Sequence, residues 1–307
     1  MKIVIAGGTG LIGRELSSRL ATVGHNVVIL TRDSTGQAPA GQVRRVEWDP
    51  DGTAGPWARD VDGADAVVNL AGAGIADSRW TEARKRELRS SRVLPTRSLV
   101  SAIRQATIRP SVFLQGSGVN FYGAADPERE IDESFPPGED FLGDLCVAWE
   151  AEAHAVSALG CRLVIFRSGV ILANDGGAVA RLRRPFRWFV GGPVASGKQY
   201  VSWIHRDDWV AMAMWALSTP TVSGILNSTS PAPVPNAKFS SALGRALHRP
   251  SWLAAPHVML RALFGELATV MLVKSQRVVP KRALDLGFTF THPSIDEAME
   301  DVIGLRA

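Results

Sequence analysis

Short runs rich in apolar and β-branched residues recur along the first half of the chain, and segments with helical spacing of apolar residues separate them. The runs predicted as strands cover residues 3–5, 27–30, 43–48, 64–70, 111–115 and 161–166. The runs at 3–5 and 27–30 are wholly apolar, which is typical of strands buried on both faces of a parallel sheet. The longest helical patterns lie at about 81–105 and 141–158. This alternation predicts an α/β fold with a doubly wound parallel sheet and right-handed crossovers.

A glycine-rich turn follows the first predicted strand. Glycines fall at positions 7, 10 and 13, and a helix containing Leu16 and Leu20 comes next. Strand, turn and helix bring backbone N–H groups and the positive end of a helix dipole to one point, where a pyrophosphate binds. The spacing is GxxGxxG rather than the commoner GxGxxG, and a purely steric turn is the alternative. The flanking strand and helix favour a Rossmann-type dinucleotide site.

The second predicted strand ends at Thr31 and Arg32, with no acid at its tip. Dinucleotide folds that prefer NAD place Asp or Glu here, where the carboxylate bonds the ribose 2′-hydroxyl. An arginine suits a 2′-phosphate instead, through a charge-assisted contact, although a plain surface arginine is the alternative. We therefore predict NADP as the cofactor.

The pattern loosens after residue 172. Glycines and prolines interrupt an apolar, tryptophan-bearing region at about 173–200, which we predict to be a substrate-side insertion. A further strand is expected at 201–204, and a helix begins near Asp207. From Pro231 the chain is helical and broken by prolines. We predict a dinucleotide-binding domain at 1–230 and a smaller C-terminal, substrate-side domain at 231–307.

Composition narrows the class of protein. The 307 residues are 46% hydrophobic and 21% charged, as in a globular enzyme rather than a disordered or fibrous chain. The formal charge is +4, and the basic clusters at 84–86 and 181–184 lack the aromatic interleaving of a nucleic-acid platform. Two cysteines, Cys146 and Cys161, form no disulfide framework and lack metal-ligand spacing. With no apolar run long enough to span a bilayer, we expect a cytoplasmic protein without metal, nucleic-acid or membrane partners.

Several segments occur in the order found in one large superfamily. They are GGTGLIG at 7–13, NLAG at 69–72, the stretch from Ser117 to Tyr122-Gly123, and RSGVIL at 167–172. On these residues the chain resembles the extended short-chain dehydrogenase/reductases, which include nucleotide-sugar epimerases and dehydratases. Further segments, among them GGPVASGKQYVSWIH at 191–205, resemble its "epimerase family" branch, some of whose members carry a cell-division-inhibitor label. That branch has a small C-terminal domain of unassigned function, which here would begin near Pro250.

The resemblance implies a set of cofactor contacts along the carboxyl edge of the sheet. Glycine-turn residues would hold the phosphates, the tip of the second strand the 2′-phosphate, and later segments the adenosine, ribose and nicotinamide. In chain order these residues are Gly7, Thr9, Gly10, Leu11, Ile12, Gly13, Thr31, Arg32, Leu70, Ala71, Gly72, Glu87, Arg92, Arg167, Ser168 and Ile171. Arg92 stands where extended members usually have an asparagine.

The superfamily's Tyr-x-x-x-Lys pair, in which lysine holds the ribose and lowers the tyrosine pKa, is missing. Alignment with the resemblance puts Leu142 at the tyrosine position and Cys146 at the lysine position. Ser117 and Tyr122 are the candidates to replace the pair, as carbonyl partner and proton donor; a capping serine and a packed tyrosine are equally good interpretations. We expect Cys146 to be a core residue and His205 to be structural or capping.

Two functions therefore stay open. One is an NADP(H)-dependent oxidoreductase or epimerase-like enzyme that moves a hydride to or from an alcohol, carbonyl or sugar-type substrate. The other is a non-catalytic NADP(H)-binding sensor or regulatory partner, which the missing pair favours. The substrate is a small molecule that the sequence leaves unidentified. The resemblance also implies a homodimer through the helices after strands four and five.

Overall fold

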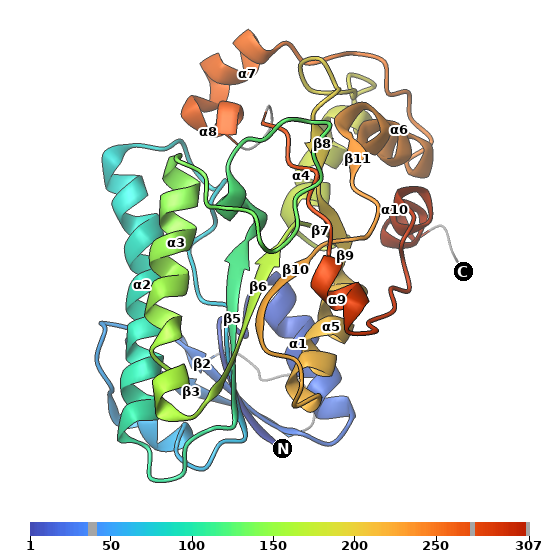
Figure 1. Ribbon diagram of the computed structural model, residues 1–307. Coiled ribbons are helices and arrows are strands. Elements are labelled where there is room, and N and C mark those ends of the chain that lie inside the picture. The colour runs from blue at the N-terminus through green and yellow to red at the C-terminus, as the bar shows by residue number, and fades with distance from the viewer. Residues whose placement is uncertain (36–41, 271–273, 305–307) are drawn as a thin grey trace.

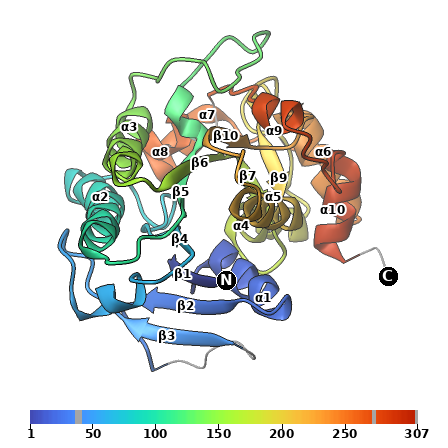
Figure 2. The ribbon, with the colours of Figure 1, turned by 60° about the horizontal axis from the view of Figure 1, so that its bottom comes forward.

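A parallel sheet with helices on both faces forms the body of the protein (Figures 1 and 2). The computed structural model describes residues 1–35, 42–270 and 274–304. Within them the main sheet has seven strands, in the order β10-β6-β5-β4-β1-β2-β3, and every pair is parallel. The strands are β1 Lys2–Ala6, β2 Asn26–Thr31, β3 Val43–Glu47, β4 Ala66–Asn69, β5 Val112–Gly118, β6 Arg162–Ser168 and β10 Gly224–Ser228. The predicted doubly wound α/β fold is confirmed.

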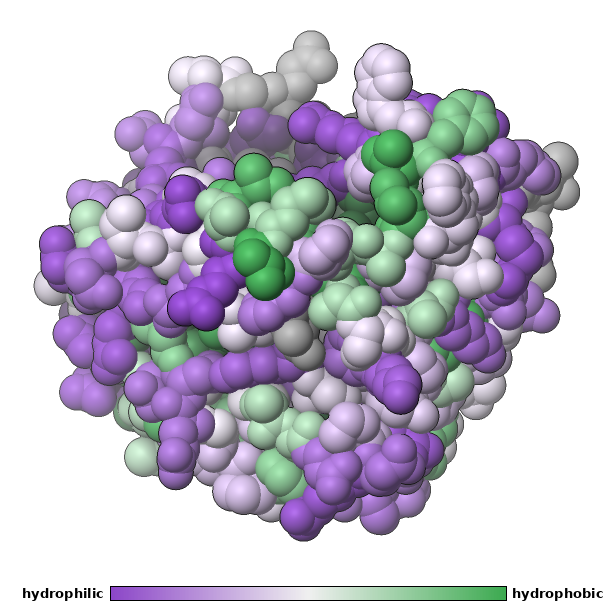
Figure 3. Space-filling model, turned by 90° about the horizontal axis from the view of Figure 1, so that it is seen from above, coloured by the Kyte–Doolittle hydropathy of each residue, from purple (hydrophilic) through white to green (hydrophobic). Residues whose placement is uncertain are grey.

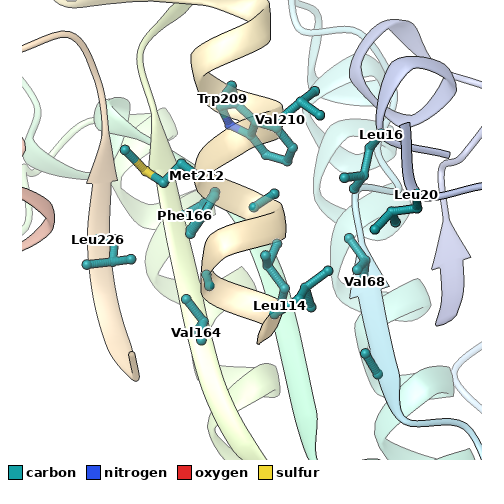
Figure 4. Close-up of a cluster of buried hydrophobic side chains, with 14 of the residues drawn as sticks. Leu16, Leu20, Val68, Leu114, Val164, Phe166, Trp209, Val210, Met212 and Leu226 are labelled. Carbon is teal, nitrogen blue, oxygen red and sulfur yellow. The ribbon is translucent and has the colours of Figure 1, made fainter. Parts of the chain in front are cut away.

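Alternate residues of each strand enter two different cores. Ile3 and Ile5 of β1 face α1 (Leu11–Thr22) and α5 (Arg206–Ser218), whereas Val4 faces α2 (Glu82–Gln105) and α3 (Phe141–His154). Figure 4 shows the first core, where side chains of the central strands meet those of α1 and α5. Because both faces are covered, the central strands lack polar alternation, and this made them predictable from the sequence.

Smaller elements extend the carboxyl edge of the sheet on the side of β10. They are β7 Val170–Leu172, β8 Tyr200–Val201, β9 Trp203–His205, β11 Val234–Pro235, α4 Gly177–Arg187, α6 Asn236–Ala246, α7 His257–Phe264, α8 Glu266–Ala268, α9 Lys281–Asp285 and α10 Ile295–Ile303. A third core joins residues of β7, β9 and α4 to residues of α6 and α10. We keep 231–307 as the proposed C-terminal domain, although this core is shared across residue 230.

The structure differs from the predicted elements where polar residues are involved. β5 runs on to Gly118, beyond the expected end at 115, because the buried Gln115 side chain is hydrogen-bonded to Asn69 and to the Gly116 carbonyl. β10 had no apolar run to reveal it, since it begins with a glycine at φ +74° and ends in Asn227-Ser228. None of the helices in the described part of the chain is long and apolar enough to cross a membrane.

Candidate functional site

The turn after β1 has room only for glycine at two of its positions. Gly7 has φ +78°, and a Cβ there would lie 2.6 Å from the Leu70 carbonyl carbon. A Cβ on Gly13 would lie 2.3 Å from the Gly7 oxygen, because α1 starts directly against the turn. The Gly10 amide closes the turn by donating to the Gly7 oxygen at 3.0 Å. Sequence and backbone therefore agree on a tight strand–turn–helix junction.

The N-terminus of α1 offers its positive end to a ligand. Gly10 is the N-cap residue and supplies no side-chain cap, and the first turn contains no acid. First-turn amides such as those of Leu11 and Ile12 have no carbonyl partner within a helix. Leu11 also packs against Gly176 and Gly177, where a Cβ would approach its methyl groups to 3.0 Å. The junction thus fits a phosphate group, with the start of α4 beside it.

At the tip of β2, Arg32 is exposed and has no ion-pair partner among the described residues. Thr31 fixes the turn, because its hydroxyl donates to the Asp33 carbonyl at 3.1 Å and accepts from the Asp33 amide. The Asp33 carboxylate accepts from the Thr35 amide and hydroxyl, which holds its pKa below the usual range. Arg32 therefore presents an unpaired positive charge at the tip of β2, the strand next to β1 and its glycine turn.

The carboxyl end of β4 borders the same turn. The Leu70 amide donates to the Ala6 oxygen at 2.8 Å, and the Ala71 amide donates to Asn69 Oδ1 at 3.2 Å. Gly72 lies against the guanidinium of Arg92, whose Cζ would be 3.2 Å from a Cβ at this position. These small residues keep the strand end close to the turn and to α2.

Arg92 is a buried cation without a carboxylate partner among the described residues. Its side chain is 6% exposed and donates to the carbonyls of Leu88 and Ala73 at 3.0 Å each. The guanidinium lies over the Trp149 ring, 5.2 Å from the centroid. Burial lowers its pKa to about 10. A buried charge of this kind is costly alone and favourable beside an anion. Glu87, by contrast, is exposed and pairs with Arg84 at 2.6 Å.

The two catalytic candidates both lie in one buried network at the end of β5. Ser117 Oγ donates to Glu150 Oε1 at 2.6 Å, and Glu150 forms a two-point ion pair with Arg167 at 2.9 and 2.8 Å. Tyr122 Oη accepts from Arg167 Nη1 at 3.1 Å and donates to Asn227 Oδ1 at 2.7 Å. The structure brings the candidates together and gives each hydroxyl an internal partner.

The environment of this network keeps the tyrosine neutral. Burial raises the pKa of Tyr122 to about 12, although the charge of Arg167 works in the opposite direction. For Arg167, burial lowers the pKa but the bonds to Glu150 outweigh it, so the pKa is raised. Cys146 lies beside the network, 3.8 Å from the Gly118 oxygen, and burial raises its pKa to about 11. It belongs to a small apolar core, as expected.

Arg167, Ser168 and Ile171, the residues expected on the nicotinamide side, differ in their hydrogen bonds and burial. All three guanidinium nitrogens of Arg167 donate within the network, which uses three of its five N–H groups. The Ser168 hydroxyl accepts from Trp209 Nε1 and from Ser228 Oγ, both at 2.9 Å. Ile171 is half-buried in β7, next to the start of α4. We therefore retain Arg167, Ser168 and Ile171 in the proposed site, with Arg167 also holding the buried network together.

His205, His292 and Asp301 form the one group of potential metal ligands found among the described residues. His205 Nδ1 caps α5 by accepting from the Asp207 amide, so its proton lies on Nε2, 3.2 Å from Asp301. The imidazoles of His205 and His292 stack with their centroids 3.9 Å apart and their planes tilted by 31°. Burial lowers the His205 pKa, and His292 adds to this. Within this group His205 is the helix cap, as expected.

Three features of the site were missed by the sequence reasoning. Asn227 comes from the unpredicted β10, and Glu150 was not among the candidate site residues. A second buried chain joins Asn69, Thr96 and Trp149, with Thr96 Oγ1 accepting from the other two at 2.9 and 3.0 Å. Buried polar residues at consecutive strand ends were the available signal, because such groups need partners.

Comparisons with known proteins agree with this geometry. The family model "NAD dependent epimerase/dehydratase family" matches residues 3–227, and a domain of unknown function (DUF1731) matches residues 255–302. The latter begins close to the boundary expected near Pro250.

Similar relatives span nearly the whole chain. Epimerase family protein Mb2239 of Mycobacterium bovis is 40% identical over 97% of this chain and 96% of its own length. Epimerase family protein SDR39U1 of Bos taurus is 38% identical over 99% and 100%. The crystal structure of human epimerase family protein SDR39U1 with NADPH superposes with a TM-score of 0.88, at 34% identity and 99% coverage of both chains. The chain belongs to the NAD dependent epimerase/dehydratase family.

Proposed function

We propose that this protein binds NADP(H) along the carboxyl edge of β1, β2 and β4. The observation that carries the proposal is the glycine junction: an uncapped α1 N-terminus and, at the next strand tip, the unpaired charge of Arg32. The first would hold the pyrophosphate and the second the 2′-phosphate. The human relative crystallised with NADPH supports the same choice of dinucleotide.

Arg92 would hold the ribose or phosphate side of the bound dinucleotide. Its guanidinium lies between the end of β4 and α3, bonded to the Ala73 carbonyl and placed over the Trp149 ring. Trp149 lies on α3, the helix that carries Cys146 at the lysine position of the superfamily, so a positive charge from α2 faces that helix. Only part of its hydrogen-bonding capacity is used by Leu88 and Ala73. A bound anion would offset the cost of burying the charge.

For the reaction we propose hydride exchange with an alcohol or carbonyl, the chemistry that a nicotinamide supplies when bound. The Ser117 hydroxyl would hydrogen-bond the substrate carbonyl, and Glu150 and Arg167 fix its orientation. The Tyr122 hydroxyl is neutral at physiological pH, as a proton donor must be, but donates to Asn227 in the structure. Its use as an acid would require that hydrogen bond to be exchanged for one to the substrate.

The internal hydrogen bonds of Ser117 and Tyr122 favour a second candidate, a non-catalytic NADP(H)-binding sensor or partner protein. Both candidate hydroxyls have internal partners, and the thiol at the lysine position is held neutral by burial. Such a site can bind a dinucleotide without exchanging protons with a substrate. Both functions require NADP(H) binding, but only the enzyme converts a substrate.

Cofactor choice is tested by titrating NADPH and NADH against the wild type and Arg32→Ala. Loss of one charge-assisted contact should weaken NADPH binding by roughly tenfold to a hundredfold and leave NADH almost unchanged. Arg104→Ala, an exposed arginine at the far end of α2, is the matched control. An unchanged NADPH-to-NADH ratio in Arg32→Ala would show that Arg32 has no part in selection.

Turnover is tested in both directions: NADPH deuterated at nicotinamide C4 with a panel of carbonyls, and NADP+ with alcohols and sugar nucleotides deuterated at the carbinol carbon. An enzyme transfers deuterium from NADPH to a carbonyl or from an alcohol to NADP+, and Ser117→Ala then lowers turnover while NADPH affinity is kept. If NADPH binds tightly and no deuterium is transferred in either direction, the sensor function is favoured. Selective loss of turnover in Tyr122→Phe would count heavily against the sensor.

A further inference from the structure

Large apolar side chains are exposed together at one end of the molecule. Eight of the fourteen exposed large hydrophobic residues identified in the described part of the chain come from two segments: Trp188, Phe189, Val190, Trp252, Leu253, Val258, Met259 and Leu263. Trp188 is 80% exposed and Val258 79%. Figure 3 looks down on the end that carries α7, and its hydrophobic surface gathers in neighbouring groups among hydrophilic side chains. We call these eight residues the apolar face.

The two segments are joined by backbone contacts, so the apolar face is a defined surface. The Leu253 amide donates to the Gly191 oxygen at 3.3 Å, and Ala195 and Ala255 are linked by backbone hydrogen bonds to the facing segment. A Cβ on Gly192 would lie 2.3 Å from the Leu253 oxygen, which fixes how closely the segments approach. Phe189 has φ +60°, a conformation uncommon for residues other than glycine, and its ring is 54% exposed.

Positive charge predominates along the segments that carry the apolar face. Residues 177–265 contain ten lysines and arginines but only two acids, Asp207 and Asp208, both in the first turn of α5. The next acid, Glu266, is the first residue of α8 and is paired with Lys85 at 2.7 Å. Exposed arginines adjoin the apolar residues: Arg184 and Arg187 on α4, Arg249, and Arg261 on α7. The Arg249 guanidinium lies 4.8 Å from the centroid of the Phe189 ring. Apolar, aromatic and cationic groups therefore share one surface.

We propose that the apolar face and its arginines bind the surface of a lipid bilayer that contains anionic lipid. Interfacial binding combines insertion of apolar side chains with attraction of Lys and Arg to acidic headgroups. Tryptophan suits the boundary between headgroups and hydrocarbon. The earlier expectation of no membrane partner rested on the lack of a spanning segment, which interfacial binding does not need. The proposal is independent of the reaction.

Other occupants fit this surface less well. In a symmetric dimer the same patch faces itself, so the arginines of one copy would oppose those of the other. A single-stranded nucleic acid would stack on aromatic rings, which on the apolar face only Trp188, Phe189 and Trp252 supply. The other five exposed residues are aliphatic: Val190, Leu253, Val258, Met259 and Leu263. A bilayer accepts aliphatic and aromatic side chains alike and supplies negative charge over the whole face.

The test is sedimentation of the full-length chain with vesicles of phosphatidylcholine alone or with phosphatidylglycerol added. The protein should sediment with the anionic vesicles, less so as salt is raised, and weakly or not at all with the neutral ones. Trp188→Ser with Trp252→Ser should weaken binding by roughly tenfold for each residue. Arg187→Gln with Arg249→Gln should weaken it by about fivefold for each arginine.

Ile108→Ser is the matched control, because Ile108 is 66% exposed but lies before β5, at the opposite edge of the sheet. It should bind anionic vesicles as the wild type does. Unchanged thermal unfolding temperatures and NADPH affinities identify variants that are folded. Absence of sedimentation with anionic vesicles at low salt, or equal sedimentation of the wild type and the tryptophan variant, would overturn the proposal. So would a dimer in size-exclusion chromatography that the tryptophan variant abolishes, without vesicle binding.

Discussion

Replacing Glu150 by leucine tests the buried network most directly. The Glu150 and Arg167 side chains are 5% and 3% exposed, and the carboxylate accepts two hydrogen bonds from the guanidinium and a third from Ser117. Glu150→Leu leaves Arg167 buried without a counter-charge. Breaking a buried ion pair in this way typically costs about 3–5 kcal/mol. We expect a loss of that size in the free energy of unfolding.

The loss should be visible in both urea and heat. An unfolding entropy of about 2.1 cal/mol/K per residue, taken over the 307 residues, converts the range to a fall of roughly 5–8 °C in the midpoint. Tryptophan fluorescence follows the urea transition, since the chain has nine tryptophans. NADPH affinity of the folded variant reports whether the network also supports the cofactor site.

Glu152→Leu is the matched control on the same helix. Glu152 pairs with Arg97, whose side chain is 52% exposed, and a surface pair contributes at most about 1 kcal/mol. The double variant Glu150→Leu with Arg167→Met removes both charges and should be less destabilised than Glu150→Leu alone. Equal losses for Glu150→Leu and Glu152→Leu, or a double variant no better than the single one, would refute the reasoning.

Two further predictions concern the turn and the tyrosine. Gly13→Ala should lower both thermal stability and NADPH affinity, the latter by more than about tenfold, because its Cβ would lie 2.3 Å from the Gly7 oxygen; a fluorescence titration measures it. Tyr122→Phe removes bonds to Asn227 and Arg167 and should cost about 1–2 kcal/mol at neutral pH. Because the folded pKa is raised from 10.0 to about 12, wild-type stability is complete below pH 10 and falls by up to about 2.7 kcal/mol as pH rises through about 12.

Each of these has a control within the chain. Gly118→Ala is the same substitution where the nearest atom is 3.8 Å from the added Cβ, so it should leave the unfolding midpoint almost unchanged. Equal losses in Gly13→Ala and Gly118→Ala would remove the steric argument. The Phe variant lacks the alkaline loss, so the difference in unfolding free energy between it and the wild type should shrink above about pH 10 and change sign by about pH 12. A constant difference would show that Tyr122 ionises normally.

Local pattern was enough for much of the fold and for the cofactor half of the site. Five of the predicted strands, β1, β2, β4, β5 and β6, consist mostly of residues buried in the two cores on either face of the sheet. The edge strand β3 is only partly buried. The glycine turn was legible because Gly7 and Gly13 meet backbone within a few residues or at the adjacent strand, where no other residue fits. Prediction failed at β10, whose polar residues are kept in the sheet by partners distant in the sequence.

The sequence by itself determined the parallel sheet, the glycine junction and the cation at the tip of β2, since each depends on neighbouring residues or on simple burial. Tertiary structure decided the chemistry available at the end of β5. Tyr122 meets Asn227 from 105 positions away, and Ser117 meets Glu150 from 33. Whether a hydroxyl is free to act depends on such partners and on burial. Both arise only when distant strand ends are brought to one edge of the sheet, because the strength and direction of a hydrogen bond depend on geometry in space.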